Sequence, residues 1–288
     1  VAAPLGGMTL AQLGAEVIRF DPIGGGIDTG RWPLTRDGAS LYWTGLNKGK
    51  RSIMLDIRSD EGRALVGRLL GAGGPDGGIL VTNFPGTGWL AYETLREARD
   101  DLIMVNLIGT REGGSAVDYT VNCGIGFPFA TGDAHDDQPV NHMFPVWDAV
   151  TGLAVALSVL AAERHRRRTG AGQLVRLALA DIALWMVGNM GHIAEVEING
   201  DDRRSAGNHV FGAFGRDFAT ADGRRVMIVA ITRGQWRALV GTLGLATRMA
   251  ALETAFDASF DDEGQRYRAR HAIAALIEPW VAARTLAE

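Results

Sequence analysis

The feature that most constrains this chain is a run of apolar side chains from Ala149 to Ala162, interrupted only by two hydroxyl residues and Gly152. Such a run predicts a helix that is buried on most of its sides. It is too short to cross a bilayer, which takes about 20 apolar residues. We therefore expect this helix to lie at the centre of a globular core.

Asp148 directly precedes this run and follows Pro145 by three residues, where the N-cap of the helix is expected. Aspartate is a preferred N-cap residue, so Asp148 has a purely structural explanation. A carboxylate at a buried helix start, kept ionised by the helix dipole, is also a suitable nucleophile. The residue pattern alone leaves both interpretations open.

Composition limits the classes of function. The chain has 288 residues, 47% hydrophobic and 22% charged, which is typical of a soluble globular protein with more than one domain. A net charge of −4 argues against nucleic acid as the main partner. The single cysteine, Cys123, excludes internal disulfides, fits a reducing cytoplasm and is expected to fill space in the core. We find no metal-binding motif, P-loop, signal peptide or transmembrane run, and therefore expect a cytoplasmic protein without a metal or a membrane partner.

Strand and helix patterns alternate through the first 199 residues. Short apolar or alternating runs predict strands at 16–20, 51–57, 78–84, 102–109 and 173–179, and helices at 5–14, 60–70 (capped by Ser59), 88–100 and from about 180 to 197. This order predicts a doubly wound, Rossmann-like parallel sheet in a domain spanning 1–199. Ligands are expected at the carboxyl ends of its strands, where Asn83-Phe84-Pro85 and Gly109 lie. Asn83 before a proline is equally well explained as a turn residue.

Two other regions complete the pattern. Residues 110–147 read as a long loop passage, a type of segment that is usually functional. Residues 205–288 predict a smaller α+β domain, with a hairpin at 214–220 and 224–231 and helices near 235–243 and 263–283. Its opening segment, 205–215, contains Gly212 and Gly215, which would let backbone approach a substrate closely. We expect this segment to act as a lid.

Several strings of residues resemble class III CoA-transferases of the CaiB/BaiF type and occur in the same order as in that family. They are Leu-Gly-Ala-Glu-Val-Ile-Arg at 13–19, Leu-Asn-Lys-Gly-Lys-Arg-Ser-Ile at 46–53, Leu-Asp-Ile-Arg at 55–58, Asn-Phe at 83–84 and Thr-Gly-Ala-Gly-Gln at 169–173. The resemblance covers essentially the whole chain. It implies that Asp148 attacks an acyl-CoA thioester, with coenzyme A as part of the substrate and no tightly bound cofactor. It also implies an interlocked homodimer.

The same resemblance implies a set of CoA-binding residues: Leu55, Arg58, Asn83, Phe84, Pro85 and Gly109. Two departures from the family pattern stand out. Val1 and Ala2 occupy the place of Gln-Ala, and Pro22 replaces an arginine. We therefore expect the CoA phosphates to be contacted instead by Arg31, Lys48, Lys50 or Arg51. The chain also starts without methionine and ends within a helical pattern, which we interpret as a piece lacking the first strand and the C-terminal return of the family fold.

Further strings, at 4–13, 117–122, 141–148 and 212–218, resemble family members that move CoA between the C1 and C4 carboxylates of mesaconyl-CoA, also called 2-methylfumaryl-CoA. In this interpretation His142 is a substrate contact or proton donor, although a loop histidine is also often an ordinary satisfied polar residue. One alternative is intermolecular CoA transfer to another small acid. An α-methylacyl-CoA racemase is disfavoured because Val117-Asp118 stands where that enzyme carries a His-Asp pair, and a non-catalytic binding module is disfavoured by Asp148.

Overall fold

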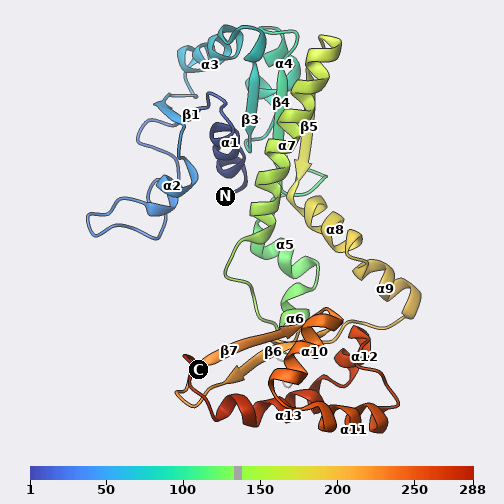
Figure 1. The fold of residues 1–288 in the computed structure, drawn as a ribbon. Coiled ribbons are helices and arrows are strands. Elements are labelled where there is room, and N and C mark those ends of the chain that lie inside the picture. Colours follow the sequence, from blue (N-terminus) through green and yellow to red (C-terminus); the bar gives the residue numbers. More distant parts are fainter. Residues whose placement is uncertain (133–137) are drawn as a thin grey trace. The chain divides into compact units, whose positions relative to one another are not determined.

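The computed structural model describes residues 1–132 and 138–288 (Figure 1). Its contacts divide the chain into two compact units. Unit 1 comprises residues 1–126 and 142–201, and unit 2 comprises residues 127–141 and 202–288. Residues 127–141, which we had placed in the first domain, therefore belong to unit 2. Each unit has its own hydrophobic core.

Unit 1 is built on parallel strands, as the alternating pattern predicted, but they form two sheets and not the single sheet we expected. Strand β1 (Ile18–Asp21) pairs with β2 (Arg51–Met54), and β3 (Ile79–Thr82), β4 (Ile103–Ile108) and β5 (Gln173–Ala178) form the second sheet in that order. Thr82 pairs with Asn106, and Ile108 pairs with Ala178. The carboxyl ends of these three strands consequently lie along one edge, which we call the carboxyl edge.

Helices cover both faces of the three-stranded sheet. Helix α1 (Ala2–Gln12) and α7 (Val146–Thr169) pack on the face presenting Val105 and Leu107. On the other face, α3 (Asp60–Ala72) and α4 (Tyr92–Arg96) pack around Leu102 and Met104. The remaining elements of unit 1 are α2 (Leu41–Leu46), η1 (Gly74–Asp76), η2 (Gly88–Leu90), α5 (Asp118–Gly124), α8 (Leu179–Asn189) and α9 (His192–Asn199). Ser59 caps α3 as predicted, since its hydroxyl accepts the Gly62 N–H at 3.0 Å.

Helix α7 corrects two expectations. Its 24 residues are long and apolar enough to cross a membrane, a test that core helices of globular units also pass, so the prediction that it is too short is wrong. It is also buried mainly on one side. Val155 and Val159 face the sheet, whereas Leu153, Leu157 and Leu160 are 48–69% exposed. The apolar run reflects a helix with one packed face and one open face.

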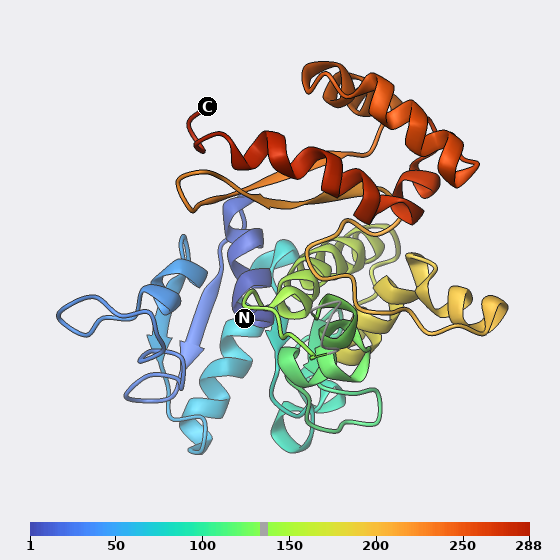
Figure 2. The same cartoon turned by 90° about the horizontal axis from the view of Figure 1, so that it is seen from below.

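Two glycines let α1 lie directly against α7 (Figures 1 and 2). A Cβ on Gly6 would lie 2.6 Å from a Val155 methyl carbon. A Cβ on Gly152 would lie 2.9 Å from Leu5 Cβ and 3.0 Å from the Ala2 carbonyl oxygen. Close helix contact therefore explains why the apolar run is broken by glycine at position 152.

Unit 2 is the predicted α+β unit. Strands β6 (Phe214–Ala219) and β7 (Arg225–Ala230) form the expected antiparallel hairpin. It packs with α10 (Arg233–Thr242), α11 (Ala246–Phe256), α12 (Glu263–Arg268) and α13 (Arg270–Ala282). Helix α11 was not predicted, and the expected helix at 263–283 is two helices. Unit 2 also contains α6 (Phe127–Thr131). Together with α5, this helix shows that the passage 110–147 is not the structureless loop we expected.

Candidate active site

Asp148 is the third residue of α7, so it is not the N-cap that its position after Pro145 suggested. Pro145 occupies the N-cap and has no side chain able to cap the helix. Because α7 connects β4 to the parallel strand β5, it runs back across the sheet, and its first turn lies at the carboxyl edge (Figure 1). Ligands bind at this edge in open α/β sheets.

The capping carboxylate comes from elsewhere in the chain. Asp118, the first residue of α5, is 1% exposed, and its Oδ2 accepts the backbone N–H of Asp148 at 2.9 Å. It thereby satisfies one of the N–H groups that a helix start leaves without an intrahelical partner. Asp118 was not among the predicted site residues, although it lies in a string that resembled the family. Its partner is 30 residues away in sequence, so no local pattern indicates the contact.

His142 lies against the same carboxylate. Its Nε2 is 2.5 Å from Asp118 Oδ1, and its ring meets the edge of Tyr119 with centroids 5.8 Å apart. The structure therefore brings the predicted residues Asp148 and His142 to opposite oxygens of one buried aspartate. It also shows that a histidine can reach Asp118 although position 117 is a valine, so a missing His-Asp pair in sequence does not by itself disfavour a racemase.

Burial raises the pKa of Asp148, whose side chain is 24% exposed. The negative charge of Asp118 reinforces this shift. The Ala2 N–H and the Arg31 charge lower the pKa by smaller amounts. The ionised carboxylate is therefore less favourable here than in water.

The predicted CoA-binding residues fall into two groups. Asn83, Phe84 and Pro85 are exposed directly after β3, and Gly109 follows β4, so all four lie at the carboxyl edge near the start of α7. Leu55 and Arg58 follow β2 in the other sheet. There Leu55 is buried, with its N–H donating to Asp21 at 2.8 Å, and the Arg58 side chain is 92% exposed.

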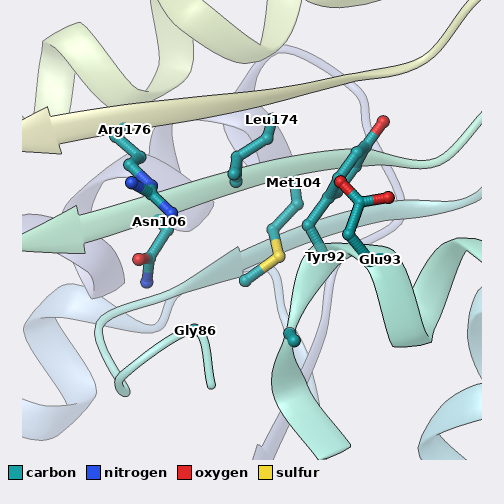
Figure 3. Close-up of a pocket in the computed structure, with 8 residues that line it drawn as sticks. Gly86, Tyr92, Glu93, Met104, Asn106, Leu174 and Arg176 are labelled. Carbon is teal, nitrogen blue, oxygen red and sulfur yellow. The ribbon is translucent and has the colours of Figure 1, made fainter. Parts of the chain in front are cut away.

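A pocket of about 130 Å³ lies beside Asn106 and Gly86, and Gly86 directly follows the turn at 83–85 (Figure 3). Buried Asn106 shapes this turn, because its Nδ2 donates to the carbonyl oxygens of Thr82 at 3.3 Å and Phe84 at 2.9 Å. A Cβ on Gly86 would approach the Asn106 Oδ1 to 3.3 Å. Asn106 is therefore a second residue that sequence reasoning missed. The pocket is lined by Gly86, Ala91, Tyr92, Glu93, Met104, Asn106, Leu174 and Arg176.

The four cations expected to contact the CoA phosphates differ in burial and in their hydrogen-bond partners. Lys50 Nζ donates to the carbonyl oxygens of Pro4 and Leu46 and to Asn47 Oδ1 at 2.7–3.0 Å. All three ammonium hydrogens are used within the fold, so Lys50 is not a phosphate contact. Burial, aided by the Arg19 charge, lowers its pKa to about 8.

The other three candidate cations are exposed. Arg51 forms an ion pair with Glu16 at 2.7 Å, and Lys48 lies in the turn before β2. Arg31 donates to the Tyr42 hydroxyl at 3.1 Å and is near enough to Asp148 to lower its pKa. Arg31 is therefore the candidate cation whose charge reaches Asp148.

Gly212 and Gly215 belong to unit 2, and both have local reasons to be glycine. Gly212 has φ of +77°, and a Cβ on Gly215 would lie 2.7 Å from a Val210 methyl carbon. The segment 205–215 is anchored within unit 2 by Ala206 N–H donating to Ala130 and Gly207 N–H donating to Gly132, each at 3.0 Å. Its role as a lid stays a prediction.

Two further expectations concern sulfur and metals. Cys123 is exposed on α5, so the prediction that it fills space in the core is wrong. Within the described ranges, no three side chains of His, Cys, Asp or Glu gather in a way that would hold a metal ion.

The chain is similar to known proteins along its whole length. It is 60% identical to the 2-methylfumaryl-CoA isomerase of Chloroflexus aurantiacus over 289 residues, covering all of this chain and 71% of that protein. It is 33% identical to the succinate–glutarate CoA-transferase of Agrobacterium fabrum, covering 85% of this chain and 64% of that protein. A crystal structure of a CaiB/BaiF family protein from Brucella suis matches with a TM-score of 0.78 and 27% identity, covering 99% of this chain and 75% of that one.

These similarities agree with the parallel α/β architecture of unit 1. The model of CoA-transferase family III matches residues 1–288, which leaves no part of the sequence outside the family. The chain belongs to CoA-transferase family III.

Proposed function

We propose that this protein converts mesaconyl-C1-CoA (2-methylfumaryl-CoA) into mesaconyl-C4-CoA by intramolecular CoA transfer, with Asp148 as the nucleophile. The observation that carries the proposal is a half-buried carboxylate of raised pKa at the carboxyl edge, in a chain 60% identical to a 2-methylfumaryl-CoA isomerase. A carboxylate nucleophile requires no metal and no tightly bound cofactor.

The reaction proceeds through the aspartate in two halves. An oxygen of ionised Asp148 attacks the C1 thioester carbon, the C–S bond breaks, and a mixed anhydride and CoA thiolate form. The thiolate attacks the aspartyl carbonyl carbon, the anhydride C–O bond breaks, and an aspartyl-CoA thioester and mesaconate result. Mesaconate then attacks the aspartyl thioester carbon through its C4 carboxylate, the C–S bond breaks, and a second mixed anhydride and CoA thiolate form. The thiolate attacks the C4 carbonyl carbon, the anhydride C–O bond breaks, and mesaconyl-C4-CoA and ionised Asp148 result. No net proton is gained or lost.

This route places two demands on the protein. Exchanging a thioester for an anhydride is uphill, so binding energy from the distant part of CoA has to be used at the reacting centre. The exposed turn at 83–85, which Asn106 holds in shape, supports a role in CoA binding. The anhydride must also be kept from water, and the segment 205–215 is our candidate for that role.

Intermolecular transfer of CoA to a separate acid is the second candidate. The 33% identity with a succinate–glutarate CoA-transferase favours it, because the same aspartyl-CoA thioester would serve both reactions. The intramolecular and intermolecular reactions differ only in whether the released acid stays bound while CoA is attached to Asp148 as a thioester.

The test is incubation with mesaconyl-C1-CoA followed by mass spectrometry of the intact protein and its peptides. We expect a CoA adduct on Asp148, and no adduct and no isomerisation in Asp148→Asn. Isotope-labelled free mesaconate added to the reaction should remain unincorporated if transfer is intramolecular. Wild-type isomerisation rates in Asp148→Asn would refute the proposal, and label entering the product would establish the intermolecular alternative.

A further inference from the structure

Asp118 is a buried titratable group of unit 1 to which the reaction sequence gives no role. It is 1% exposed, and both of its carboxylate oxygens are engaged by groups at the active site. Oδ2 accepts the N–H of Asp148 at 2.9 Å, and Oδ1 lies 2.5 Å from His142 Nε2. Burying a carboxylate is costly unless hydrogen-bond donors compensate it, and both donors here belong to residues expected to contact substrate.

We propose that Asp118 is a positioning residue that fixes the nucleophile and His142 relative to each other. This inference rests on the proposed function, because it assigns Asp118 a part in bringing the acyl group and Asp148 together. The hydrogen bond to Asp148 holds the first turn of α7, which sets where the Asp148 carboxylate points. The contact with His142 fixes the imidazole ring through Nε2.

With Nε2 engaged, His142 presents Nδ1 as its remaining polar atom. The ring is 23% exposed and makes an edge contact with Tyr119, so it is held on two sides and open on another. An imidazole held in this way suits a hydrogen bond to the free carboxylate of a dicarboxylic acyl group. Asp118 therefore links the group that attacks one carboxyl end of the substrate to a group suited to hold the other.

Asp118 also acts on Asp148 through its charge. Among the described residues, the groups that influence Asp148 are Asp118 on α5, Arg31 in the loop after β1 and the Ala2 N–H at the start of α1, and His142 contacts Asp118. Removing the negative charge at position 118 makes ionisation of Asp148 easier. The acid limb of the kcat/KM profile should then move to lower pH, which a loss of packing alone would not produce.

The chain supplies a matched control on the same two helices. Asn122 of α5 is buried, and its Oδ1 accepts the Trp147 Nε1–H of α7 at 3.0 Å. Asn122→Leu removes this hydrogen bond between α5 and α7 and leaves the Asp148 and His142 residues unchanged. Any effect of Asp118→Asn that merely reflects looser helix packing should appear equally in Asn122→Leu.

The experiment compares full-length wild type, Asp118→Asn, Asn122→Leu and His142→Gln by pH profile and by the rate of CoA-adduct formation on Asp148. We expect Asp118→Asn to lower kcat roughly 10- to 100-fold, the range for misplacing a reacting group by about 1 Å, and to shift the acid limb to lower pH. Asn122→Leu should stay within a few-fold of wild type with an unmoved limb. The double variant Asp118→Asn/His142→Gln should lose no more than the worse single variant, because the two residues act as one unit.

Unchanged kcat and an unmoved acid limb in Asp118→Asn would overturn the inference, as would equal effects in Asn122→Leu. If Asp118→Asn does not fold, the wild-type protein provides the test. A hydrogen bond of 2.5 Å to Nε2 should give a low-field proton resonance that His142→Gln removes, and its absence would exclude the pairing. If wild type forms the adduct but does not isomerise mesaconyl-CoA, the proposed function fails. The pH dependence of adduct formation still tests Asp118 in that case.

Discussion

Replacing Gly152 with alanine tests whether close contact between α1 and α7 positions the active site. The new Cβ would lie 2.9 Å from Leu5 Cβ and 3.0 Å from the Ala2 carbonyl oxygen, and neither atom can rotate away. Overpacking of this kind costs about 1–3 kcal/mol, and the immobile neighbours place this case near the upper end. Alanine recovers about 1 kcal/mol of helix propensity over glycine. The net effect should be a loss of about 2 kcal/mol in the free energy of unfolding.

Gly67 of α3 is the matched control. It is also inside a helix of unit 1, but a Cβ there would have no atom within 4 Å. Gly67→Ala should therefore raise the free energy of unfolding by about 1 kcal/mol. Urea titration of the two variants and wild type measures both changes through the unfolding midpoints.

Activity provides a second readout of the Gly152 variant. Displacing α1 moves the Ala2 N–H, which hydrogen-bonds to the Asp148 carboxylate, so kcat should fall while Gly67→Ala leaves it unchanged. If Gly152→Ala stabilised the protein as much as Gly67→Ala, the inferred helix contact would be wrong.

Three further predictions follow from charge and burial. Because burial raises the pKa of Asp148 and the nucleophile must be ionised, kcat/KM should fall on the acid side at a pH above the ordinary aspartate value of about 3.9, as a pH–rate profile would show. Lys50 has a folded-state pKa of about 8, against an ordinary value of 10.5. Between these two pH values the folded state binds fewer protons than the unfolded state, so the free energy of unfolding of the wild type should rise with pH. Lys50→Met should lack that rise in denaturant titrations at several pH values. Arg166 is 4% exposed and donates to the Gly77 and Asp101 carbonyl oxygens, so Arg166→Met should cost about 3 kcal/mol, whereas exposed Arg168→Met should stay within about 0.5 kcal/mol in the same assay.

Local pattern predicted the elements of unit 1 well because strand and helix periodicity are properties of neighbouring residues. The strands at 78–84 and 102–109 and the cap at Ser59 were recovered within a few residues of their observed positions. The same reasoning missed α5 and α11. Helix α5 spans only seven residues, and the apolar residues of neither helix form a long periodic run.

The candidate site shows a different balance. Asp148 was singled out from its place beside an apolar helix and from the resemblance to a family, but its structural role was misassigned. The carboxylate that accepts the N–H at the helix start belongs to Asp118. Lys50 was a predicted phosphate contact, but its ammonium group donates hydrogen bonds to carbonyl oxygens of the fold. In both cases the partners come from other segments, and a residue's own neighbours do not reveal which distant atom will meet it.

The amino-acid sequence by itself determined the parallel α/β class and the hairpin unit, and it singled out Asp148 as the proposed nucleophile, because these depend on periodicity, turn chemistry and strings of adjacent residues. Only the tertiary structure decided that Asp118 joins His142 and Asp148 across 24 and 30 residues of sequence and that α7 leaves one apolar face open. The physical reason is that hydrogen bonds and burial depend on which surfaces pack together. Periodicity shows that one face of a helix is apolar, but it does not show which part of the chain covers that face.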